Sequence, residues 1–153
     1  MKAKQLLLIA VAAISSISFI ACSSDDDETP PTPKTPAEAL AGTWKGTVTG
    51  DDAKTDNNAV LIITANANGT IELIQPSFTL KNSNSPTTGA VVHKVEIEET
   101  ENGYKFYQKY ISNAGGASVV GEVWGTVQGN EITFDYIWNH TGTDYLLHFK
   151  GKK

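Results

Sequence analysis

Apolar and polar residues alternate along most of the chain from Gly42 onward, in short runs separated by clusters of Gly, Asn and Asp. Alternation with a period of two is typical of β-strands, and helical periodicity is confined to Ala37–Leu40. The pattern predicts an all-β domain over residues 40–153. Its expected strands cover residues 43–50, 58–66, 69–75, 77–82, 90–99, 103–112, 117–128, 130–139 and 143–151.

The connections between these strands are short. Asn68-Gly69, Asn102-Gly103 and Gly129-Asn130 are dipeptides typical of tight hairpins, so we expect consecutive strands to be antiparallel neighbours. About eight strands at hairpin spacing favour an antiparallel up-and-down β-barrel. A Greek-key sandwich is the alternative, although the sequence does not show the long crossover connections that it needs.

Alternation also assigns one face of each strand to the interior. This face is rich in aromatic rings, and polar His93 and Gln108 share its phase. The expected inward aromatic residues are Trp44, Tyr104, Phe106, Tyr110, Phe134, Tyr136, Trp138, Tyr145 and Phe149.

Two interpretations of this inward face stay open. An apolar lining with a few polar groups is typical of a ligand pocket. The candidate ligand-binding residues are then His93, Tyr104, Phe106, Gln108, Tyr136 and Trp138. However, a barrel of about eight strands is just wide enough for side chains to fill it, so the same residues also fit a solid core.

The first 21 residues have the pattern of a secretory signal peptide. Lys2 and Lys4 precede an apolar stretch that begins at Leu6 and ends in small residues before Cys22. At about 16 residues this stretch is short for a membrane-spanning helix, although an uncleaved N-terminal anchor is the alternative. The following residues, 22–39, combine four consecutive acids with a Pro- and Thr-rich run and predict an extended tether.

The residues Phe19-Ile20-Ala21-Cys22 resemble the lipobox of bacterial lipoproteins. The resemblance implies that Cys22 is lipidated and becomes the first residue of a mature protein that is anchored to a membrane without spanning it. The acidic run Asp25–Glu28 resembles the export signal that follows the lipidated cysteine in Bacteroidetes lipoproteins. It implies an outer-membrane lipoprotein displayed on the cell surface, and the alternative is a solubilising spacer.

The start of the β domain carries a second resemblance. Ala41-Gly42-Thr43-Trp44 is similar to the Gly-x-Trp start of calycins, the barrel group that includes lipocalins. The stretch from Leu40 to Lys153 resembles the small calycin-like barrels of Bacteroidetes lipoproteins. In that group a basic residue on the last strand packs over the first-strand Trp. The resemblance therefore implies that Lys150 or Lys152 covers Trp44 through a cation–π contact.

Composition narrows the classes of partner. The chain has twelve basic residues, all of them Lys, against seventeen acids, for a net charge of −5. Loss of Lys2 and Lys4 with the signal peptide brings the charge to about −7. Nucleic-acid binding needs clustered basic residues, so we exclude that partner. Cys22 is the only cysteine, which excludes an intramolecular disulfide and a Cys-based zinc site.

The sequence contains no motif for catalysis, metal binding or cofactor binding. His93, His140 and His148 lack the spacing of a metal site, and no serine lies in a nucleophile elbow. Asp135 and Asp144 approach each other across a hairpin but belong to the outward face. We therefore expect neither an enzyme nor a metal or cofactor.

Two functional hypotheses follow. One is a lipid-anchored envelope lipoprotein that binds a small apolar or amphipathic ligand inside the barrel. The other is a protein-interaction or inhibitor module with a filled core, which acts on an envelope protein through its loops at 82–89 and 113–117. A hydrolase would need two acids, or an acid and His93, in one cleft.

Overall fold

A computed structural model describes residues 34–114, 117–140 and 142–153. The chain divides into two compact units, Met1–Pro31 and Thr32–Lys153, and every described residue lies in the second unit. The predicted signal peptide, the lipidation site Cys22 and the tether up to residue 33 lie outside the described residues.

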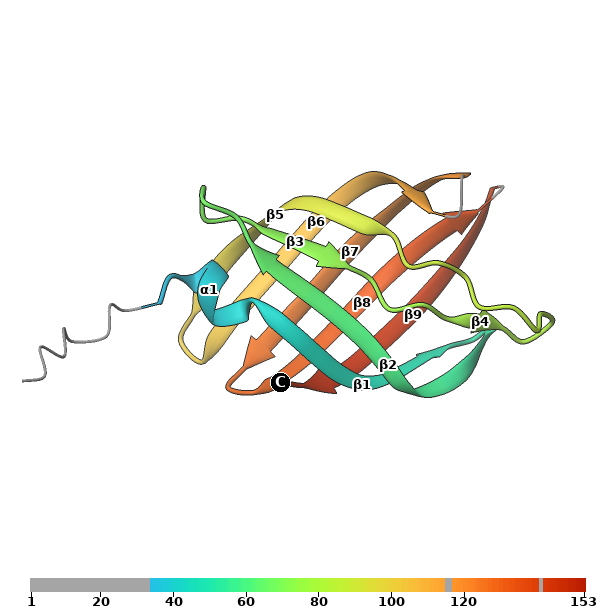
Figure 1. The fold of residues 1–153 in the computed structure, drawn as a ribbon, viewed down its shortest axis with the longest axis horizontal. Helices are drawn as coiled ribbons and strands as arrows, with labels where there is room; N and C mark the ends of the chain where they lie inside the picture. The colour runs from blue at the N-terminus through green and yellow to red at the C-terminus, as the bar shows by residue number, and fades with distance from the viewer. Residues whose placement is uncertain (1–33, 115–116, 141) are drawn as a thin grey trace, which may run out of the picture. The chain divides into compact units, whose positions relative to one another are not determined.

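Within the second unit, one short helix precedes nine strands (Figure 1). The elements are α1 (Pro36–Leu40), β1 (Gly42–Gly50), β2 (Ala53–Ala65), β3 (Ile71–Ile74), β4 (Thr79–Leu80), β5 (Val91–Thr100), β6 (Gly103–Ala114), β7 (Ala117–Gln128), β8 (Glu131–His140) and β9 (Thr143–Lys152).

Eight of the strands close into an antiparallel barrel in the order β1-β9-β8-β7-β6-β5-β3-β2. β1 closes the ring because it pairs with both β9 and β2. The ninth strand, β4, lies outside the ring and pairs with the start of β2. The predicted up-and-down barrel is therefore confirmed, and the sandwich alternative is wrong.

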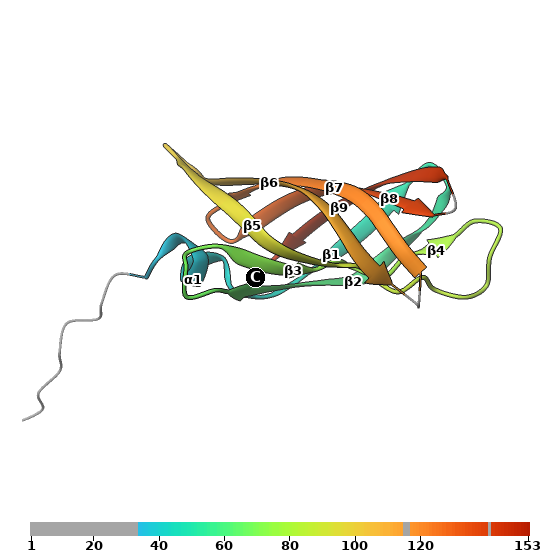
Figure 2. The same ribbon diagram turned by 90° about the horizontal axis from the view of Figure 1, so that it is seen from above.

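The predicted strand at 77–82 is wrong in its extent, since β4 covers only Thr79–Leu80. Residues 75–90 cross the end of the barrel opposite α1, as the two views in Figures 1 and 2 show. This segment contains Pro76 and Pro86, which lack the N–H that a strand ladder needs. Phe78 anchors the segment in the core, where it is 2% exposed. The backbone N–H of Gln75 also donates to Ala90 O at 2.9 Å.

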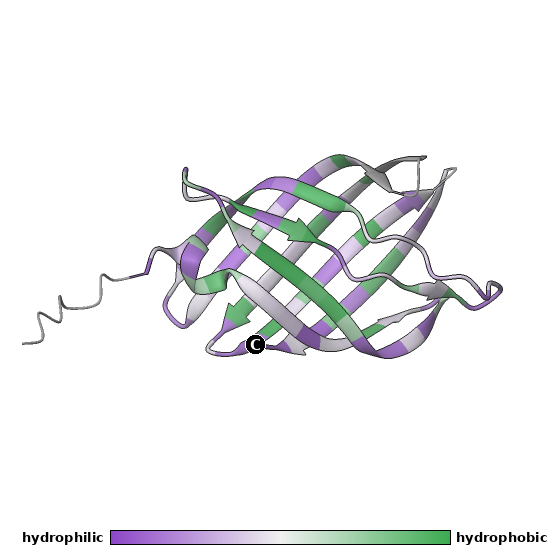
Figure 3. Ribbon diagram, viewed as in Figure 1, coloured by the Kyte–Doolittle hydropathy of each residue, from purple (hydrophilic) through white to green (hydrophobic). Residues whose placement is uncertain are grey.

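The barrel interior is built from the inward phase of each strand. Apolar and polar bands alternate along the strands in Figure 3. On β8 this phase contains Ile132, Phe134, Tyr136 and Trp138, all at most 5% exposed. The inward assignment of Phe134, Tyr136 and Trp138 from the sequence is confirmed.

Helix α1 closes one end of the barrel. Thr35 and Glu38 form a reciprocal capping box at its start, which satisfies two backbone N–H groups at the helix N-terminus. Its Ala37 and Leu40 are 1% and 0% exposed, and Leu40 O accepts a hydrogen bond from Trp44 Nε1 at 3.0 Å. The packed core thus includes Ala37 and Leu40 from this helix.

The cation over Trp44 is Lys153, and the expectation of Lys150 or Lys152 is wrong. Lys153 Nζ lies 5.6 Å from the centroid of the Trp44 ring and donates to Ala39 O at 2.9 Å. The reason is the phase of β9, in which Phe149 and Gly151 are buried while Lys150 and Lys152 are exposed. Partial burial lowers the pKa of the Lys153 ammonium.

A β-bulge interrupts the alternation on β5. Ile71 pairs with Val95 and Leu73 pairs with Val92, so that two β5 residues, His93 and Lys94, oppose the single residue between them on β3. Lys94 adopts the left-handed backbone conformation, with φ of 55°. The predicted inward orientation of His93 is therefore wrong, because a bulge shifts the phase of a strand by one residue.

We expect the substitution Lys94→Gly to raise the free energy of unfolding by up to about 1 kcal/mol, because glycine adopts the left-handed conformation without the steric cost that Lys pays. The matched control is Lys45→Gly on β1, also exposed but in regular strand conformation, which we expect to lower it by about 1 kcal/mol. Urea unfolding of the two variants measures the difference. Equal destabilisation by both would contradict a strained bulge.

Candidate functional site

Five of the six candidate ligand-binding residues face the barrel interior, and three of them are inaccessible. Phe106, Tyr136 and Trp138 are 4%, 1% and 5% exposed. Tyr104 and Gln108 are half-buried. The sixth, His93, is exposed on the outer surface.

The interior rings pack against one another. The centroid distances are 5.1 Å for Phe134–Tyr136, 5.9 Å for Phe106–Phe134 and 5.2 Å for Phe78–Trp138, within the range of favourable aromatic pairs. Because these side chains have almost no accessible surface, they leave very little space beside them for another molecule. Among the described residues, the barrel interior is a filled core.

Two tyrosine hydroxyls join this core to residues 75–90, the segment that crosses the end of the barrel opposite α1. Tyr110 Oη accepts a hydrogen bond from Gln75 Nε2 at 2.8 Å and donates to Ile137 O at 3.1 Å. Tyr136 Oη donates to Pro76 O at 3.1 Å. Burial raises the pKa of Tyr110 to about 12 and also raises the pKa of Tyr136. Both hydroxyls are thus neutral structural cross-links.

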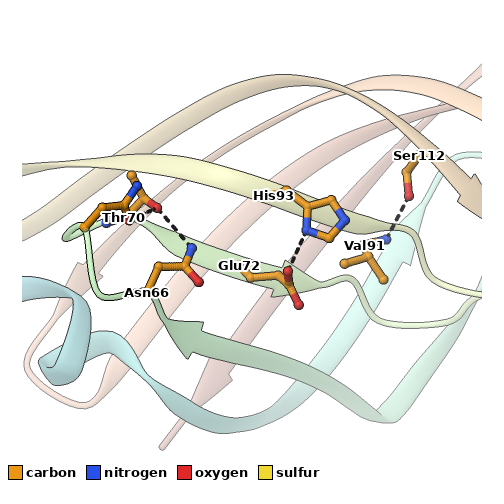
Figure 4. Close-up of polar contacts among 7 residues, drawn as sticks. Asn66, Thr70, Glu72, Val91, His93 and Ser112 are labelled. Carbon is orange, nitrogen blue, oxygen red and sulfur yellow. Dashed lines mark hydrogen bonds and ion pairs between the residues drawn. The ribbon is translucent and has the colours of Figure 1, made fainter.

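His93 forms a cross-strand pair on the outer surface (Figure 4). Its Nδ1 lies 2.5 Å from Glu72 Oε2 on β3. His148 makes a similar pair with Asp135, also at 2.5 Å, and is likewise exposed on the outer surface. Both imidazoles are more than half exposed, so neither pair has the enclosed surroundings of a catalytic or metal site.

The other predicted chemical candidates are not assembled into a cluster. Asp144 pairs with Asn139, whose Nδ2 lies 2.5 Å from Asp144 Oδ1, and Asp135 pairs with His148. The side chain of His140 lies outside the described part of the chain. In that part, no group of three or more His, Cys, Asp or Glu side chains is arranged to hold a metal ion.

The first candidate loop, 82–89, is fixed to the barrel. Thr87 donates from both its backbone amide and its hydroxyl to Phe78 O at 2.7 Å. Lys54 Nζ donates to Ser83 O at 2.7 Å. The side chains of the second candidate loop, 113–117, lie outside the described residues.

The outer surface of β5–β8 carries a groove of about 510 Å³. We call it the outer groove. Its walls include exposed Tyr107 and half-buried Trp124, which are directly opposite each other on β6 and β7. Charged side chains surround these rings: Glu96 and Glu98 from β5, Lys105 from β6 and Asp135 from β8.

This groove was not predicted from the sequence, and neither Tyr107 nor Trp124 was among the candidate residues. The available signal was one aromatic residue in the outward phase of each of two consecutive strands. The register that places Tyr107 opposite Trp124 was not predicted from the sequence.

These observations define a class of protein: a closed eight-stranded antiparallel barrel with a filled aromatic core and a groove on its outer surface. Comparison with known proteins gives no match to a family model, to a curated protein or to a solved structure. In the part of the chain that the structure describes, no helix is both long and apolar enough to cross a membrane.

The buried tyrosines generate a prediction for alkaline pH. Tyr110 ionises near its ordinary value of 10.0 when unfolded but at about 12 when folded, so above pH 10 the unfolded state binds fewer protons. The free energy of unfolding should therefore fall as the pH rises from about 10 to about 12. Below pH 10 the ionisation of Tyr110 should not affect it. Urea unfolding across this range measures the slope, which Tyr110→Phe should reduce. An unchanged slope in the variant would disprove the assignment.

Proposed function

We propose that this protein is a lipid-anchored lipoprotein of the bacterial outer membrane, and that its barrel is a rigid scaffold that binds a partner on its outer surface. The observation that carries the second part is the inaccessibility of the inward aromatic side chains. It favours the interaction-module hypothesis over a ligand held inside the barrel. Because loop 82–89 is fixed to the barrel, we place the binding surface on the strands.

The outer surface offers apolar area for such binding. Tyr107, Ile111, Val120 and Leu146 are 50%, 75%, 55% and 46% exposed, and all four lie on β6, β7 or β9. Ile111 and Val120 are directly opposite each other. Clusters of exposed apolar side chains mark interaction surfaces more often than isolated ones do.

The anchor is proposed from the N-terminal sequence. Lipidation at Cys22 would hold the protein at the membrane, because two or more acyl chains give stable binding where one gives only marginal binding. The acidic Pro- and Thr-rich tether would give the barrel reach from the surface. Calycin-like ancestry stays part of this proposal, with Trp44 beneath Lys153 as its structural support.

Substitution of Cys22 tests the anchor. We expect Cys22→Ala to abolish labelling with a radioactive fatty acid and to leave an unprocessed precursor, whereas Ser23→Ala should be labelled and processed as the parent is. Gel mobility and fatty-acid incorporation in the source bacterium measure both. Normal lipid labelling of Cys22→Ala would refute the anchor.

Extraction of the purified full-length protein tests the filled core. We expect mass spectrometry of the organic extract to find no stoichiometric ligand apart from the acyl chains at Cys22. Phe106→Ala is the positive control, because removal of a buried ring leaves an apolar cavity that can take a small hydrocarbon such as benzene. A ligand recovered from the parent protein, and displaced by benzene, would refute the scaffold proposal.

A further inference from the structure

The outer groove is organised as two rows of outward side chains that cross four strands. In the first row Glu96, Tyr107, Trp124 and Asp135 are successive register partners on β5, β6, β7 and β8. In the second row the partners are Glu98, Lys105, Thr126 and Thr133. The two aromatic rings thus have a carboxylate residue on either side of them in the first row, Glu96 at one end and Asp135 at the other.

Two of the carboxylates in the groove have no partner. Within the described residues, neither Glu96 nor Glu98 makes a hydrogen bond or ion pair, although Lys105 is directly opposite Glu98. Asp135, in contrast, is paired with His148 at 2.5 Å. Three carboxylates and one ammonium therefore line the groove, which gives it a negative potential.

The aromatic rings and the carboxylates favour the same kind of ligand. The faces of Trp and Tyr rings attract ammonium and guanidinium groups, and unpaired carboxylates attract them too. An anion would be repelled by the three carboxylates. A purely apolar ligand would cover Glu96 and Glu98 without supplying a partner, which costs desolvation energy.

A second hollow of about 640 Å³ lies along the same strands and has apolar side chains in its lining, those of Ile111, Val120 and Ile137. Lys109 and Glu122 also line it, and they are paired with each other at 2.8 Å. From Lys105 to Ile111 the strand rises about 20 Å, the length of roughly six residues of extended peptide.

We infer that the outer groove binds the basic side chains of an extended cationic peptide segment, with apolar side chains of the same segment seated on Ile111 and Val120. The inference rests on the proposed function, because it assigns the binding surface of the scaffold. Unpaired Glu96 and Glu98 receive the ammonium or guanidinium groups, and the rings of Tyr107 and Trp124 cover them.

The probe is the synthetic peptide acetyl-Lys-Ser-Lys-Ser-Leu-Ser-Leu-Ser-amide, which in extended form presents two Lys and two Leu on one face. Its counterpart has Glu in place of both Lys. Binding to the full-length protein in mild detergent is measured by calorimetry and by tryptophan fluorescence. Trp124 is the half-buried indole that ligand binding would affect, since Trp44 and Trp138 are in the core.

We expect the Lys peptide to bind and the Glu peptide not to bind. The double variant Glu96→Gln/Glu98→Gln should raise the Kd of the Lys peptide roughly five- to tenfold, and Tyr107→Leu/Trp124→Leu should raise it by a similar factor. Binding should weaken as salt increases. All these side chains face outward, and a thermal melt of each variant verifies that it is folded.

The matched control is Glu99→Gln/Glu101→Gln, which removes the same charge from exposed positions next to the groove. We expect it to leave the Kd within about twofold. Equal weakening by both double variants would overturn the inference, because binding would then reflect net charge alone. Failure of the Lys peptide to bind at millimolar concentration would also overturn it, as would equal binding of the Glu peptide.

The two proposals fail in different ways. A ligand extracted from the barrel core would refute the scaffold proposal whatever the peptide titration shows. An empty core and a lipidated Cys22, combined with no peptide binding, would refute only the cationic-peptide inference.

Discussion

The aromatic core depends on glycines that lie opposite its largest side chains. Gly125 on β7 is flanked by Phe106 on β6 and Phe134 on β8, and Gly121 is flanked in the same way by Tyr110 and Trp138. A Cβ on Gly125 would lie 2.3 Å from Phe106 Cζ, and one on Gly121 would lie 2.6 Å from Tyr110 Oη. An eight-stranded barrel has room for side chains but not for large ones at every position, so these glycines are what allows the rings to fill it.

This packing limits the space available inside the barrel. Aromatic rings occupy the interior, and tyrosine hydroxyls fix residues 75–90 to the end of the barrel. A ligand inside the barrel would have to displace the rings and break these hydrogen bonds. The same strands nevertheless present a second, independent surface, because alternate residues point outward. Tyr107 and Trp124 belong to that surface, and they have no part in the core. One strand sequence thus supplies the packed core from one face and the outer groove from the other.

The parts of the structure that were predicted from the sequence are those governed by local pattern. Alternation placed Phe134, Tyr136 and Trp138 inward, and the hairpin dipeptides located three of the turns. His93 was misplaced because the bulge at Lys94 shifts the phase, and no local signal marked that bulge. Lys153 was overlooked because the expectation was limited to the strand itself.

The candidate site was harder to foresee because it depends on register between strands. Tyr107 and Trp124 are far apart in the sequence, and only the pairing of β6 with β7 brings them together. Their carboxylate neighbours come from two further strands. Each of these residues taken alone is of a type that is common at solvent-exposed positions. The groove can therefore be recognised only once the pairing of the strands is known.

The double pairing of β1 also affects the order in which the barrel can be completed. Val48 on β1 pairs with Phe149 on β9, a contact that joins residues about one hundred positions apart and is therefore slow to form. During synthesis from the N-terminus, β1 and β2 can form their hairpin early, but one edge of β1 stays unpaired until β9 has emerged. Until then that edge offers unpaired N–H and C=O groups to any other strand, so the pairing of β1 with β9 also removes a site of edge-to-edge association.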